Sequence, residues 1–295
     1  MRVEQVVAGP MRLGEGIVWD SAAQRLCWVD ILARKVFVCR ADGGDLQAWD
    51  MPTEVGFCAP HISGGLVVGL NDGFALLDTA SGDLTPWRDP EPDRPGNRFN
   101  DAATDQNGRL WAGTMPLSGA GPKAEGALYR LDSPMIAHQV IKGFWIQNGM
   151  AFSADGATGY VSDSAPHVQT IWRFALDRHT GAPRDRDVFL ETRDLAGRPD
   201  GATVDAEGCY WFAAVDGWQI LRVTPEGVVD RHVPLPVRRP TKLAFGGRDL
   251  STLYVSTMGP EMSPETPSGE QPLAGSILAL TPGVSGIATP PVQAV

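Results

Sequence analysis

Polar residues that could hold a cation recur at matching points along this chain. Each set directly precedes an apolar run with the composition of a β-strand, and the last three sets stand about fifty residues apart. If the repeated units close into a ring, these side chains converge on one axis. Their carboxylate and amide oxygens would suit a hard divalent cation and an oxygen-rich ligand. The four sets are Gly14-Glu15-Gly16, Asn97-Arg98-Phe99-Asn100-Asp101, Gln147-Asn148-Gly149 and Pro199-Asp200-Gly201.

A repeated β-unit would have to position these residues. Each unit contains apolar residues, a short turn with Asp or Gly, and then an apolar run with an aromatic residue. Asp-Gly turns supply the positive-φ residue that a tight hairpin needs. Second hairpins follow, at residues 126–131 and 171–176 for example, which gives four strands per unit. The aromatic residues that mark four of the units stand 43 to 51 residues apart, at Trp111, Tyr160, Trp211 and Tyr254.

A period of about 40–50 residues with four strands is typical of a β-propeller blade. Six units can be traced, and the weakest spans residues 64–69. The sequence therefore predicts an all-β, six-bladed β-propeller with four strands per blade, in a single domain over residues 1–295. A pair of β-sandwiches is the alternative, and the regular period disfavours it. The tail after Thr281 either pairs back to close the ring or frays. Core packing is the expected role of Trp28, Trp111 and Trp211.

Composition narrows the classes of partner. The chain has 34 Gly and 24 Pro, which favour turns, and a formal net charge of -10. Because there is no block of Lys or Arg, neither nucleic acid nor an anionic membrane is an expected partner. No apolar run approaches the ~20 residues of a membrane span. The first residues lack the apolar core of a signal peptide, and the four Cys show no CxxC spacing. We therefore expect reduced thiols, a cytoplasmic location and, for a closed ring, a monomer.

Several common catalytic motifs are absent from the sequence. It contains no Gly-x-Ser-x-Gly, no His-Glu-x-x-His and no Gly-x-x-x-x-Gly-Lys. The five His residues are scattered without ligand spacing, which argues against a His-rich zinc site. The carboxylate and amide set is what remains.

A turn could explain each member of that set taken alone, because Asn and Asp hydrogen-bond their own backbone in turns. A turn does not explain Glu15 in register with Asn148 and Asp200. Arg98 is either a surface charge or, if it faces the channel mouth, a planar fork for carbonyl or hydroxyl oxygens. Four other acidic residues fall at the opposite hairpins, where turn chemistry is sufficient, and we assign no function to them: Asp20, Asp105, Asp155 and Asp205.

In this order, the motifs resemble the SMP-30/gluconolactonase/regucalcin family of six-bladed propellers. The resemblance covers roughly residues 10–285 and rests on Leu13-Gly14-Glu15-Gly16, Asn97-Arg98-Phe99-Asn100-Asp101, Gly113-Thr114-Met115, Asn148-Gly149, Pro199-Asp200-Gly201 and Phe245-Gly246-Gly247. It implies one divalent cation held by Glu15, Asn148 and Asp200, with substrate contacts from Arg98 and Asn100. Ca²⁺, Zn²⁺, Mn²⁺, Mg²⁺ and Fe²⁺ remain open as the metal. Some relatives carry an acidic substrate contact where this chain reads Pro116-Leu117-Ser118.

The resemblance implies the hydrolysis of a sugar lactone, an aldonolactone, to the aldonic acid. A cation would polarise the lactone carbonyl as a Lewis acid, and Asp200 would orient the attacking water or accept its proton. Arg98 and Asn100 would orient the sugar. Two alternatives stay open, because a fold does not settle chemistry. One is a phosphotriesterase-like or other esterase activity on the same propeller, and the other is a calcium-binding propeller without catalysis.

Overall fold

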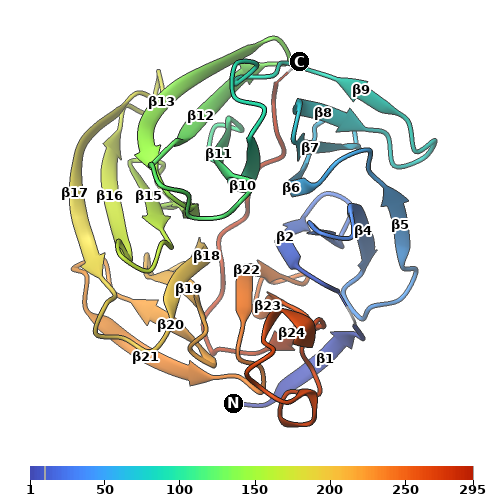
Figure 1. Cartoon of the computed structure of the whole chain (residues 1–295), viewed down its shortest axis with the longest axis vertical. Helices are drawn as coiled ribbons and strands as arrows, with labels where there is room; N and C mark the ends of the chain where they lie inside the picture. Colours follow the sequence, from blue (N-terminus) through green and yellow to red (C-terminus); the bar gives the residue numbers. More distant parts are fainter. Residues whose placement is uncertain (10, 295) are drawn as a thin grey trace.

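The computed structural model describes residues 1–9 and 11–294, and within them the strands form six antiparallel sheets around a central channel (Figure 1). Each sheet is a blade of four strands, as the sequence predicts. The first three blades are β2 (Gly14–Asp20), β3 (Arg25–Asp30), β4 (Lys35–Arg40) and β5 (Gln47–Asp50); β6 (Val55–Pro60), β7 (Leu66–Leu70), β8 (Gly73–Leu77) and β9 (Leu84–Pro86); and β10 (Asn97–Thr104), β11 (Leu110–Pro116), β12 (Gly126–Ser133) and β13 (Ile136–Phe144). The next two are β14 (Gln147–Phe152), β15 (Thr158–Asp163), β16 (Thr170–Leu176) and β17 (Pro183–Glu191); and β18 (Arg198–Val204), β19 (Tyr210–Val215), β20 (Gln219–Val223) and β21 (Val229–Pro234).

The sixth blade joins the two ends of the chain. It contains β22 (Pro240–Gly246), β23 (Thr252–Thr257) and β24 (Ile277–Leu280), and its outermost strand is β1 (Val3–Val7) from the N-terminus. β1 pairs with β24 in antiparallel register from Val3↔Leu280 to Val7↔Ile277. Two short 3₁₀ helices, η1 (Pro260–Met262) and η2 (Ser268–Glu270), lie between β23 and β24. The ring is therefore closed by β1, and not by the segment after Thr281.

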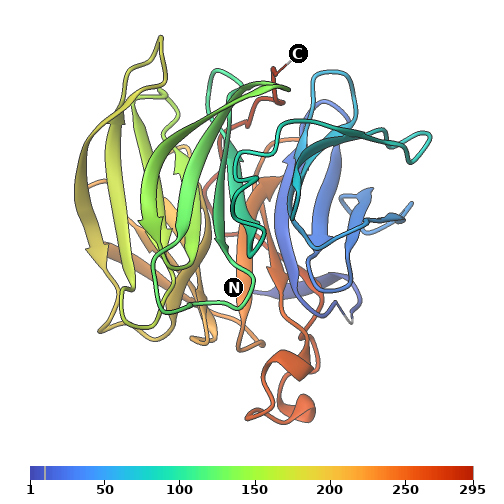
Figure 2. The ribbon, with the colours of Figure 1, turned by 45° about the horizontal axis from the view of Figure 1, so that its top comes forward.

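That tail takes a third course, which the sequence did not suggest. Its backbone crosses the end of the channel: Ala206 N donates to Ser285 O at 2.8 Å and Val292 N to Pro60 O at 2.7 Å. Both partners lie at the hairpin end of the innermost strands. Figure 2 shows the tail at one end of the ring and the η1–η2 loop projecting from the other. The tail thus covers the channel end opposite the motifs Glu15, Asn148 and Asp200.

Six apolar clusters hold the ring together, and each cluster lies between two neighbouring blades. The expected core tryptophans take part: Trp28, Trp111 and Trp211 are all buried. The cluster between the sixth and first blades packs Trp28 of β3 with Tyr254 of β23, so the seam where the ring closes is packed like the others. Burial of large apolar side chains between all pairs of blades is the main favourable term for such a ring.

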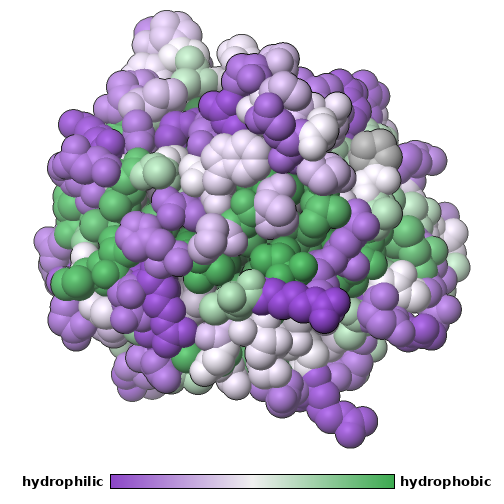
Figure 3. Space-filling view, turned by 90° about the horizontal axis from the view of Figure 1, so that it is seen from below, coloured by the Kyte–Doolittle hydropathy of each residue, from purple (hydrophilic) through white to green (hydrophobic). Residues whose placement is uncertain are grey.

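Burial falls from the channel outward within each blade. Every residue of β6 and β22 is buried, whereas most of β13 and β17 at the outside of their blades is exposed. The outer surface seen in Figure 3 accordingly mixes hydrophobic patches with hydrophilic residues. The innermost strands are thus rigidly packed on both faces, which suits them to hold a site.

The Asp residues of the opposite hairpins cap turns, as predicted, and two of them also anchor a buried tryptophan. The Asp205 carboxylate accepts from Glu207 N at 3.0 Å, Cys209 N at 2.9 Å and Trp211 Nε1 at 2.7 Å. It also accepts from Arg222 Nε at 2.8 Å, in a buried ion pair. Turn formation and core packing are therefore coupled at this end of the fifth blade.

The four cysteines are buried free thiols, as the absence of CxxC spacing suggested. Within residues 1–9 and 11–294, no helix has the length and the apolar character needed to cross a membrane.

We predict that Asp205→Asn lowers the free energy of unfolding by about 3 kcal/mol, because the buried Arg222 guanidinium loses the one fully buried carboxylate among its three partners, and Asp205 also anchors the Trp211 indole. Asp155 caps the corresponding turn of the fourth blade, where its side chain is 57% exposed, and Asp155→Asn is the matched control with an expected loss below about 1 kcal/mol. Urea unfolding measures both variants. Equal losses would contradict the anchoring role of Asp205.

Candidate metal and substrate site

A β-bulge lies near the start of every innermost strand, and the candidate site residues sit at these bulges. The strand registers shift between Glu15 and Val18, Val55 and Phe57, Phe99 and Ala102, Asn148 and Ala151, Pro199 and Ala202, and Pro240 and Leu243. A bulge breaks the strict alternation of side chains along a strand and re-aims them. The motifs therefore lie inside the strands, and not before them as the sequence suggested.

The glycines after Glu15 and Asn148 belong to this backbone irregularity and not to turns. Gly16 and Gly149 have φ values of +58° and +63°, in the left-handed region that glycine tolerates best. A Cβ on Gly149 would lie 2.5 Å from Tyr210 Oη. Both glycines are thus required by the conformation that presents the preceding side chain.

Glu15 is a buried carboxylate in β2, 6% exposed. Its Oε2 accepts a hydrogen bond from Gly16 N at 2.9 Å. Burial raises the pKa of Glu15 to about 7, and the negative charge of Asp101 adds to the rise, while Lys242 and Arg98 oppose it. A carboxylate in this environment gains from a nearby positive charge.

Asn148 presents an amide oxygen that has no hydrogen-bond partner among residues 1–9 and 11–294. Its Nδ2 donates to Ser164 Oγ at 2.9 Å, and that hydroxyl in turn donates to the backbone oxygen of Pro199. This pair of bonds ties β14 to the start of β18 and fixes the orientation of the amide. Asn148 Oδ1 is buried without a hydrogen bond. Because buried oxygens are rarely left unpaired, this atom is available for a ligand.

Asp200, 3% exposed in β18, carries the third oxygen donor. Among the described residues, no donor is bonded to its carboxylate. Burial raises its pKa well above the ordinary value, and the charge of Glu15 raises it further. Glu15 and Asp200 both lie at the bulge near the start of an innermost strand, and therefore at the same end of the channel.

Arg98 and Asn100 lie beside this group in β10. Arg98 Nη1 donates to Asn100 Oδ1 at 2.7 Å, and Arg98 Nε lies 3.6 Å from a carboxylate oxygen of Glu54. Burial lowers the pKa of Arg98, and the charges of Glu54, Glu15 and Asp200 oppose that change. Asn100 Nδ2 donates to Gln147 O at 2.8 Å. The Arg98 side chain is only 10% exposed, so it is no free surface charge, and Asn100 braces it against the fourth blade.

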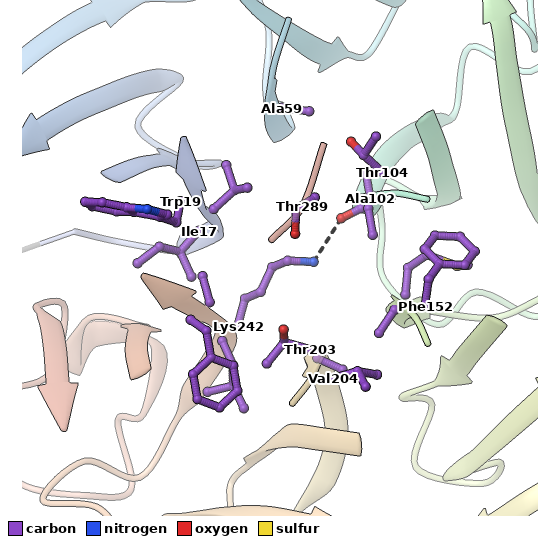
Figure 4. A pocket seen from close by; sticks show the side chains of 18 of the residues that line it. Ile17, Trp19, Ala59, Ala102, Thr104, Phe152, Thr203, Val204, Lys242 and Thr289 are labelled. Atoms are coloured by element: carbon purple, nitrogen blue, oxygen red, sulfur yellow. Dashed lines mark hydrogen bonds between the residues drawn. The ribbon is translucent and has the colours of Figure 1, made fainter. Parts of the chain in front are cut away.

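Lys242 and Asp101 form an ion pair across the channel that sequence analysis missed. Lys242 lies in the bulge of β22, and its Nζ bonds to Asp101 and to Ala102 O, the latter at 3.0 Å. Figure 4 shows the side chain reaching across the channel toward Ala102. The position of Lys242 in its blade was the available signal, because it matches the bulges that carry Glu15 and Asp200.

The channel interior beyond this ion pair is a separate cavity of about 70 Å³. Its lining includes Lys242, Thr104 and Thr203 from the innermost strands and Thr289 from the tail (Figure 4). None of the three candidate cation ligands lines this cavity. These ligands lie near the start of the innermost strands, at the end of the ring from which the η1–η2 loop projects.

The chemistry of the residues fits a hard divalent cation. Two buried carboxylates and one amide oxygen without a partner among the described residues lie at equivalent bulges of three blades, and oxygen donors of this kind suit such cations. Over residues 1–9 and 11–294, no cluster of three or more His, Cys, Asp or Glu side chains is arranged to hold a metal ion. A site built from Glu15, Asn148 and Asp200 contains only two such residues, so an amide must complete it.

Fold and geometry define a six-bladed propeller with an oxygen-lined site at one end of its channel. Residues 13–259 match the SMP-30/gluconolactonase/LRE-like family, and the chain belongs to that family. This confirms the resemblance that the motifs indicated.

Three relatives illustrate the similarity. The chain is 39% identical over 289 residues to 6-deoxy-6-sulfogluconolactonase of Pseudomonas putida, covering 97% of this chain and 96% of the relative. It is 33% identical to pentonolactonase XacC of Haloferax volcanii, again over 97% and 96% of the two chains. The crystal structure of a calcium-binding protein, regucalcin, from Agrobacterium tumefaciens superposes with a TM-score of 0.89 at 30% identity, covering 98% of this chain and 96% of that one.

Glu15→Gln is predicted to stabilise the metal-free protein at pH 8 by roughly 2 kcal/mol and to have little effect at pH 4. The folded protein holds the Glu15 proton more tightly than the unfolded chain, since the pKa of Glu15 is raised from 4.5 to about 7. Stability of the unsubstituted protein should therefore fall as the pH rises through this range. Chelator-treated protein is unfolded with urea at both pH values.

Glu4→Gln serves as the control, because Glu4 is 61% exposed in β1 and its substitution should change stability equally at both pH values. If Glu15→Gln changed stability equally at pH 4 and pH 8, ionisation of the Glu15 carboxylate would not be what destabilises the folded protein at high pH.

Proposed function

We propose that this protein hydrolyses a sugar lactone to the corresponding aldonic acid, with one divalent cation held by Glu15, Asn148 and Asp200. The observation that carries the proposal is that these three oxygen donors sit at equivalent bulges of three blades, with Asn148 Oδ1 buried and without a partner among the described residues. The lactonase names of two full-length relatives support an enzyme that opens a cyclic ester. The calcium-binding relative supports a divalent cation, whose identity stays open among Ca²⁺, Zn²⁺, Mn²⁺, Mg²⁺ and Fe²⁺.

A cation held by Glu15, Asn148 and Asp200 would supply Lewis acidity toward the lactone carbonyl and would stabilise negative charge on its oxygen. Asp200 orients the attacking water and takes its proton on a carboxylate oxygen. Its lack of other hydrogen bonds and the rise of its pKa by burial suit it to accept a proton. Glu15, whose Oε2 is fixed by Gly16 N, serves as a ligand only.

Arg98 orients the sugar. Its Nη1 is occupied by Phe99 O and Asn100 Oδ1, which fixes the plane of the guanidinium. Within the described part of the chain, Nη2 has no bonded acceptor, so this edge is free to donate to a substrate oxygen. Asn100 acts by holding Arg98, because both of its own polar atoms are engaged. Positioning of this kind lowers the entropic part of the barrier.

The end of β11 gives the site a different wall from that of relatives with an acidic contact there. Pro116-Leu117-Ser118 offers no carboxylate; Leu117 is 41% exposed, and its backbone N donates to Gly96 O at 2.8 Å. We propose that this apolar segment changes which sugar lactone is accepted, not whether a lactone is hydrolysed.

Acid release from a panel of aldonolactones tests the proposal. Metal-stripped protein is assayed with and without each divalent cation, and spontaneous hydrolysis is subtracted. Turnover restored by a cation is the expected result. Faster turnover of phosphotriesters than of any lactone would favour the esterase alternative. Cation binding without turnover of any ester would favour a calcium-binding propeller.

Asp200→Asn is expected to reduce lactone turnover by at least about a thousandfold while the far-UV circular dichroism stays unchanged, because the proton acceptor is lost and the remaining amide oxygen is a neutral, weaker cation ligand. Asp194→Asn, in the exposed loop before β18, is the matched control and should retain full activity. An active Asp200→Asn protein would remove Asp200 from the mechanism.

A further inference from the structure

Lys242 is a cationic side chain inside a group of carboxylates, and the proposed mechanism gives it no role. Its side chain is 7% exposed, and that of its partner Asp101 is 1% exposed. Taking such a pair out of water costs several kcal/mol per ion before their attraction is counted. Packing alone does not require a charged pair here, because β22 continues after Lys242 with the buried apolar residues Leu243, Ala244 and Phe245.

Asp101 lies near the proposed ligands, and its oxygens are bonded elsewhere. One carboxylate oxygen accepts from Ala102 N at 2.9 Å and from Lys242 Nζ, and the other accepts from Met150 N at 2.9 Å. Asp101 still raises the pKa of Glu15, so its charge is felt at the site. Asp101 is therefore held apart from the ligand set while it contributes to the local electrostatics.

The charges around the site can be counted from these contacts. Four carboxylates lie there, on Glu15, Glu54, Asp101 and Asp200, and two cationic side chains, on Arg98 and Lys242. Arg198 also acts on Asp200, but its charge is compensated outside this set by Asp216, at 2.8 Å, so neither member of that pair is counted. The set retains two negative charges, which is the charge that one divalent cation neutralises. Without the positive charge of Lys242, the set would carry three negative charges.

We propose that Lys242 is a positioning residue that acts as a built-in counter-charge: it binds Asp101 and matches the charge of the site to a single divalent cation. The inference rests on the proposed function, because it presupposes a cation at Glu15, Asn148 and Asp200. The alternative role of the Lys242–Asp101 ion pair is purely mechanical, as a brace between the sixth and third blades.

A counter-charge and a mechanical brace predict opposite results when the Lys242–Asp101 ion pair is removed one residue at a time. Asp101→Asn leaves the Lys242 charge uncompensated beside the cation, and the dissociation constant for Ca²⁺ or Mn²⁺ should rise about tenfold or more. Adding Lys242→Met removes that charge and restores the original balance. The double variant should therefore bind the cation more tightly than Asp101→Asn alone, within about threefold of the unsubstituted protein.

A purely mechanical brace predicts the reverse order, because the double variant also loses the Lys242 bond to Ala102 O. Isothermal titration of metal-stripped protein with Ca²⁺ and with Mn²⁺ measures the constants, and activity is not the readout. Asp205→Asn is the control: it breaks a buried ion pair at the other end of a blade and should lower stability without changing the dissociation constants.

A double variant that binds no better than Asp101→Asn overturns the counter-charge role. An unsubstituted protein that binds neither cation overturns the cation site and this inference with it. If the unsubstituted protein binds a cation and the double variant recovers affinity, but no lactone is hydrolysed, the counter-charge role stands and the proposed reaction fails.

Discussion

The candidate site depends on a backbone irregularity that is repeated in each blade. In a regular strand, side chains alternate between the two faces, so only every second residue of an innermost strand could face its neighbours across the channel. The bulges interrupt this alternation at one end of all six innermost strands. They allow Asn100 and Asp101, which are adjacent in sequence, both to join the buried polar group, through different partners. Ring closure then brings the bulges around one axis.

A polar group of this kind opposes the stability that the rest of the ring provides. Burial raises the pKa of Glu15 and of Asp200, which means that the fold disfavours their charged forms. Apolar clusters between all neighbouring blades offset that cost, and the side chains of Lys242 and Arg98 reduce it locally. A bound cation would reduce it further, so binding and folding are coupled at this site.

The fold could be predicted because every blade repeats the same pattern. A unit whose own pattern is weak can still be identified from its spacing relative to the other units. Trp111 and Trp211 mark equivalent positions and are both buried. What the repeats do not encode could not be predicted: the tail after Thr281 has no counterpart in the other units, so only its contacts with Pro60 and Ala206 revealed its course. Among the site residues, Lys242 was missed because a lysine before an apolar run reads as an ordinary strand end.

Two aspartates at opposite ends of β18, Asp200 and Asp205, have opposite roles. The number of hydrogen-bond donors around each carboxylate decides which role it has. Asp205, just after β18, accepts two backbone N–H groups, an indole N–H and a guanidinium, and so contributes to stability in its charged form. Asp200, in β18 itself, has no such donor among the described residues, and burial raises its pKa. By residue type and spacing, Asp200 and Asp205 are both simply acidic residues of one β-unit. Only the surroundings separate a carboxylate that the protein has already satisfied from one that is left for a cation, a proton or a substrate.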